Sequence, residues 1–94
     1  MCEKCKVEFN LMLTRIEEVI KAQWPETLRD GGGVWIWLDA NHPEQRKKLA
    51  SLTDRLNAAW QNGIAAEVKT ISLEWGRLQL DIFKGYARHL REAT

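Results

Sequence analysis

The chain predicts an all-α fold, a three-helix bundle in which a long C-terminal helix is central. From residue 64 to 92, apolar residues recur at helical spacing on more than one side. Two other amphipathic stretches, residues 3–23 and 42–61, are suited to cover two sides of that helix. Because 94 residues are enough for one small core, we expect residues 1–94 to form a single helical domain.

The first helix is expected over about residues 3–23. Its apolar residues share one side at helical spacing, and charged residues lie off that side. The shared face consists of Phe9, Met12, Leu13, Ile16, Val19 and Ile20. Trp24-Pro25 should end the helix, because the residue before a proline avoids the helical backbone region.

A loop and a short extended segment are expected over residues 24–40. Three consecutive glycines after Asp30 indicate a loop or hinge. The β-branched and aromatic run Val34 to Leu38 then favours a short strand. Since no second strand is evident, this strand would have to pair with another chain, or the segment is an apolar loop packed on the bundle.

The second helix is expected over about residues 42–61. Pro43 suits a first helical turn, and Asn41 with Glu44 has the spacing of a capping box. The helix carries one narrow apolar stripe, made of Leu49, Leu52, Leu56, Ala59 and Trp60. Asn62-Gly63 is a stop signal, so the second and third helices should form an antiparallel hairpin. Leu52, Leu56 and Trp60 should then contact Trp75, Leu78 and Ile82.

The third helix, about residues 64–92, is apolar around most of its circumference. A broad main face is accompanied by a second stripe that includes Leu73 and Leu80, and Gly76 between the two suits a close helix crossing. A chain this short can cover only two sides of such a helix. Leu73 and Leu80 are therefore candidate partner-binding residues, and we expect a homodimer or larger assembly.

Trp35 and Trp37 are the other candidate partner-binding residues. Tryptophan is enriched at interface hot spots, and an extended segment would place both rings on one side. The alternative is that both rings cap the helical bundle, because large aromatic side chains also fill small cores.

Composition limits the compartment and the kind of partner. The net charge is +1, from 14 basic and 13 acidic residues, which argues against a general nucleic-acid binder. No apolar run reaches the ~18–20 residues needed to span a bilayer. The charged start of the chain, without a following apolar stretch, does not resemble a signal peptide. We therefore expect a cytoplasmic protein with no membrane partner.

Cys2 and Cys5 form a C-x-x-C pair, which normally supplies half of a zinc site. The other half is missing, because His42 and His89 lie far apart in sequence. On a helix, both cysteines share the side of Phe9, so they can equally be small core residues. A thioredoxin-like redox role lacks its βαβ pattern. We expect no metal or cofactor, with zinc at Cys2 and Cys5 as the alternative.

Other polar clusters carry weaker signals. Arg46, Lys47 and Lys48 splay around the second helix, which is typical of a solvated face. His42 follows Asp39 by three residues, but no nucleophile or metal ligand can be placed beside them. We expect no enzymatic activity.

Together these features predict a small non-enzymatic protein-binding or regulatory protein, of the kind encoded as accessory or inhibitor proteins by phages and mobile elements. It would act through an apolar helical surface and associate with itself. The alternative is a zinc-dependent or DNA-contacting regulator that uses Cys2, Cys5 and the basic start of the second helix. Nothing in the sequence identifies the partner.

Overall fold

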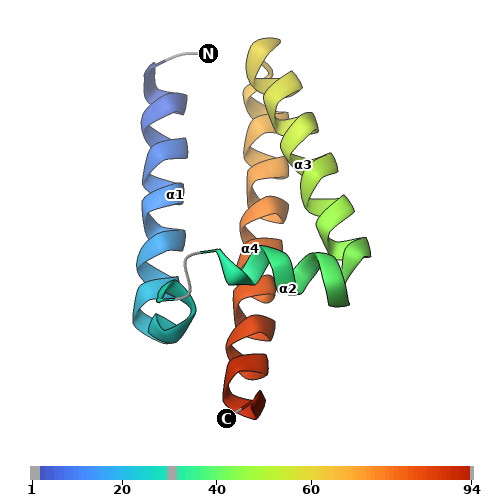
Figure 1. Ribbon diagram of the computed structural model, residues 1–94. Helices are drawn as coiled ribbons and strands as arrows, with labels where there is room; N and C mark the ends of the chain where they lie inside the picture. Colours follow the sequence, from blue (N-terminus) through green and yellow to red (C-terminus); the bar gives the residue numbers. More distant parts are fainter. Residues whose placement is uncertain (1–2, 30–31, 94) are drawn as a thin grey trace.

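The computed structural model describes residues 3–29 and 32–93, and these residues form helices with no strand (Figure 1). The all-α prediction is confirmed. The elements in chain order are α1 (Glu3–Gln23), the 3-10 helix η1 (Pro25–Leu28), α2 (Gly33–Asn41), α3 (Pro43–Gln61) and α4 (Ala65–Ala93). The three long helices begin and end within about two residues of the positions that periodicity and breakers predict.

The prediction of a strand-like segment is wrong, because residues 34–38 lie inside the helix α2. In this helix Val34 and Leu38 are four residues apart and both are buried, whereas Ile36 points away with 75% of its surface exposed. A helix satisfies its own backbone hydrogen bonds, which a lone strand in this chain could not do. The bundle therefore has four α-helices in the described residues, one more than predicted.

Two prolines and a glycine set the breaks around α2. Trp24 and His42 each precede a proline, and their backbones (φ −134°, ψ 60° and φ −137°, ψ 62°) are outside the helical region. Gly32, just before α2, has φ 112°, which favours glycine. Asn41 belongs to α2 and donates a hydrogen bond from Nδ2 to the Trp37 carbonyl, so it does not cap α3.

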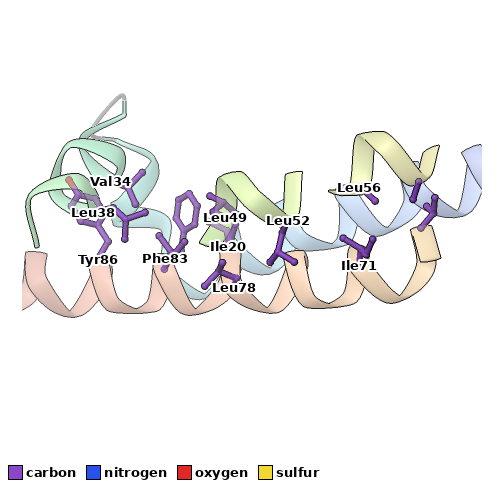
Figure 2. Packing of buried hydrophobic residues seen from close by; sticks show 13 residues of the cluster. Ile20, Val34, Leu38, Leu49, Leu52, Leu56, Ile71, Leu78, Phe83 and Tyr86 are labelled. Carbon is purple, nitrogen blue, oxygen red and sulfur yellow. The ribbon is translucent and has the colours of Figure 1, made fainter. Parts of the chain in front are cut away.

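The C-terminal helix α4 is the central element, as expected, since every other element contacts it. Figure 1 shows α3 antiparallel to α4, α1 running parallel to α4 on another side, and α2 crossing it. Figure 2 shows the buried side chains that these elements place together. The core consists of Ile20, Val34, Leu38, Leu49, Leu52, Leu56, Ala59, Val68, Ile71, Leu78, Ile82, Phe83 and Tyr86.

Helices α1 and α4 approach closely at Gly76. A Cβ atom at this position would lie 3.0 Å from Ile16 Cδ1, so the end of the Ile16 side chain would have to shift to admit a larger residue. This bears out the close crossing that the sequence suggests at Gly76.

The molecule is elongated, with principal extents of 47 × 26 × 18 Å. Its radius of gyration is 14.5 Å, whereas a compact domain of this length would have about 12.4 Å. Among the described residues, none of the helices combines the length and apolar character needed to span a bilayer.

Candidate protein interface

Trp35 packs against α4 and is half-buried. Its ring meets Phe83 edge-on, with centroids 6.1 Å apart, and the Arg46 guanidinium lies 5.1 Å from the ring centroid. The Arg46 Nε is also 3.3 Å from Asp39 Oδ1. Trp35 is therefore the centre of a contact that joins α2, α3 and α4.

Trp37 is held on the other flank of α2, between the start of α3 and the C-terminal half of α4. Its ring centroid lies 5.1 Å from His42, 5.5 Å from Tyr86 and 5.7 Å from His89. A Cβ atom at Gly85 would be only 3.3 Å from Trp37 Cη2. These contacts favour the second of the two roles considered for Trp35 and Trp37, that of capping the bundle.

Leu73 and Leu80 lie away from this aromatic cluster. Leu73, in the N-terminal half of α4, leaves 53% of its surface exposed, while Leu80 is half-buried against the core. The four predicted partner-binding residues therefore do not form one patch. Trp35 and Trp37 belong to the contact of α2 with α4, and Leu73 lies at the seam between α4 and α1.

A groove of about 370 Å³ lies along that seam, between the N-terminal halves of α1 and α4. We call it the α1–α4 groove. From α1 it is lined by Cys5, Glu8, Phe9 and Met12. From α4 it is lined by Ala65, Ala66, Val68, Lys69, Ser72 and Leu73. Most of these residues are apolar or small, so the groove is an apolar trough with charged residues on its two sides.

The groove exists because α1 covers α4 incompletely. Ile20, near the end of α1, is the only buried residue among those of this helix. Phe9, whose ring lies 5.3 Å from Trp60 on α3, and Ile16 are only half-buried. The side of α4 that faces α1 near Leu73 is therefore left open to solvent.

Two charges flank the α1–α4 groove, Glu8 on α1 and Lys69 on α4. Both are exposed, and the ion pairs of the described residues include neither of them. The buried Ser72 hydroxyl makes no hydrogen bond in the described part of the chain. Glu8 and Lys69 thus make no ion pair, and the Ser72 hydroxyl no hydrogen bond, among the described residues.

Only one of the two cysteines of the alternative zinc site, Cys5, lies among the described residues. Cys5 is half-buried and lines the α1–α4 groove, while Cys2 lies outside the described residues. Within residues 3–29 and 32–93, no group of three or more His, Cys, Asp or Glu side chains is placed to hold a metal ion. His42 and His89 both contact the ring of Trp37, and neither lines the groove that contains Cys5.

Charged neighbours lie beside three of the other polar residues singled out by the sequence, Asp39, His42 and Arg46. His42 Nδ1 lies 3.6 Å from Glu44 Oε1, and Asp39 is paired with Arg46 and not with His42. At the far end of the molecule, Arg91 Nη2 is 2.8 Å from Glu26 Oε1 and ties η1 to α4. This last contact is an ion pair without the alignment of a hydrogen bond.

A second apolar hollow lies on the other flank of α1, nearer its C-terminal end. Leu13, Ile20, Trp75 and Phe83 line it, and Glu17 and Lys21 stand on its α1 side. The sequence pattern predicts neither of these two hollows, because both depend on how α1 is placed on α4.

Comparison with protein families, curated proteins and solved structures finds no match to this chain.

Proposed function

We propose that this protein is a small non-enzymatic regulatory protein that acts by binding proteins through an apolar helical surface, and that it associates with itself. One observation carries the proposal. The accessible surface is 6406 Å². The usual scaling predicts roughly 5600 Å² for a folded chain of 10.9 kDa. The surplus of roughly 800 Å² is comparable in size to the share that one partner contributes to an interface of standard size.

The α1–α4 groove is an apolar part of the accessible surface. Leu73 is half-exposed beside Met12 and Phe9, which are themselves incompletely covered. Covering the exposed half of a leucine side chain contributes roughly 1 kcal/mol by itself. A partner that fills the trough would therefore gain stability from several such side chains at once.

The arrangement of polar residues supports a non-enzymatic role. Asp39 and His42, the pair considered for acid–base chemistry, lie beside different neighbours on the surface: Asp39 pairs with Arg46, and His42 lies beside Glu44. Neither lines the α1–α4 groove or the second hollow beside α1.

Sedimentation velocity across micromolar concentrations tests self-association. We expect a dimer or larger species that dissociates on dilution. Leu73→Asp should shift the protein toward the monomer, because it would bury a carboxylate in the apolar trough. Ile36→Asp, on an even more exposed residue of α2, is the matched control and should leave association unchanged. A wild-type protein that stays monomeric throughout would contradict the proposal.

A further inference from the structure

The two sides of the α1–α4 groove carry opposite charges at the same level of the molecule. Helices α1 and α4 run in the same direction (Figure 1), and their first few turns line the groove together. Glu8 stands on the α1 side and Lys69 on the α4 side. Neither takes part in the ion pairs of the described residues, so both are available to another chain.

We infer that the occupant of the α1–α4 groove is a second copy of this chain, related by a two-fold axis parallel to α1 and α4. The inference rests on the proposed self-association and specifies its geometry. Such an axis keeps each residue at its level and exchanges the two sides of the groove. Glu8 of one copy then faces Lys69 of the other, and the pair occurs twice, as in any isologous interface.

The charges select this axis over the other possible one. A two-fold axis perpendicular to the helices would place α1 against α1 and α4 against α4. Glu8 would then approach Glu8, and Lys69 would approach Lys69, so like charges would oppose each other across the interface. Juxtaposed like charges disfavour an arrangement, whereas complementary ones fix its register.

The apolar residues fit the same arrangement. Leu73 of one copy faces the α1 helix of the other at the level of Met12, and both residues line the groove. The small side chains of Ala65 and Ala66 leave room for that helix to approach. A net charge of +1 adds little repulsion between copies.

Charge reversal tests the geometry. Glu8→Lys alone and Lys69→Glu alone should each weaken self-association roughly tenfold or more, because each creates two like-charge contacts. An equimolar mixture of the two variants should recover association to within a few-fold of the wild type, because the mixed dimer has opposite charges at both sites. The double variant E8K with K69E should recover it as well.

Dissociation constants from sedimentation or fluorescence titration provide the readout, with circular dichroism to show that the helices are retained. Glu17→Lys, the same substitution on α1 at the other hollow, is the matched control and should associate like the wild type. Single variants that associate normally, or a mixture that does not recover, would overturn this geometry while self-association stands. A wild-type monomer would instead overturn the proposed self-association, and with it a second copy as the occupant of the groove.

Discussion

Leu56 is a buried residue of α3, with 6% of its surface exposed, and it lies over Ile71 of α4 in Figure 2. Leu56→Ala should lower the free energy of unfolding by ~2–4 kcal/mol, because it removes buried methyl groups and leaves a cavity between α3 and α4. Denaturant unfolding followed by circular dichroism measures the change.

Ile36→Ala is a suitable reference for that measurement. This side chain is 75% exposed, so its truncation should change the unfolding free energy by no more than about 0.5 kcal/mol. If Leu56→Ala had an equally small effect, the register of α3 against α4 would be incorrect.

Two tryptophans add to the packing of α2 on the rest of the molecule, beside the buried Val34 and Leu38. Trp35 contacts Phe83, and Trp37 contacts Tyr86 and His89, so the double change Trp35→Ala with Trp37→Ala should loosen α2 from α4. We expect a stability loss of several kcal/mol, measured by thermal or denaturant unfolding. A double variant that remains as stable as the wild type but loses self-association would instead assign both rings to an interface.

The protein should tolerate loss of both thiols. Because Cys5 is only half-buried in the α1–α4 groove, Cys2→Ser with Cys5→Ser should cost no more than about 1–2 kcal/mol. EDTA should leave the thermal midpoint of the wild-type protein unchanged. Stoichiometric zinc in protein purified without added metal, or a large fall in the midpoint with chelator, would favour the zinc-dependent alternative.

The long helices were predictable because each combines a periodic apolar face with a clear breaker. Pro25 follows the end of α1, and Gly63, with φ 69°, lies in the turn after α3. The apolar periodicity of each helix can be seen without knowing which helix it packs against. The helix α2 was missed because nine residues with apolar side chains on several sides fit a strand and a helix alike. Only its packing on α4, with Val34 and Leu38 inward, decides between them.

The candidate interface was only half predictable. Leu73 could be singled out because it lies on a second apolar stripe of one long helix. The opposite wall of the groove, with Phe9 and Met12, depends on how far α1 stands from α4, and a sequence pattern does not contain that distance. The sequence therefore indicated one side of the α1–α4 groove and not its shape or charges.

The whole molecule is an elongated bundle with one side of its central helix incompletely covered. If two copies close that side through Glu8 and Lys69, added salt should weaken the dimer, because both pairs remain near solvent. We expect a few-fold increase in the dissociation constant between roughly 0.05 and 0.5 M salt. E8K with K69E should show the same dependence, and a dimer that tightens with salt would point to apolar contacts alone.

The parallel placement of α1 beside α4 has a consequence for the order of folding. The antiparallel α3–α4 hairpin is closed by a short turn, so its contacts are local in sequence and form quickly. Helix α1 can join α4 only after a loop of about sixty residues closes, as between Ile16 and Gly76, and it buries little when it does. In the folded protein α1 should therefore be the first helix to open, with amide protons that exchange sooner than those of α3 and α4.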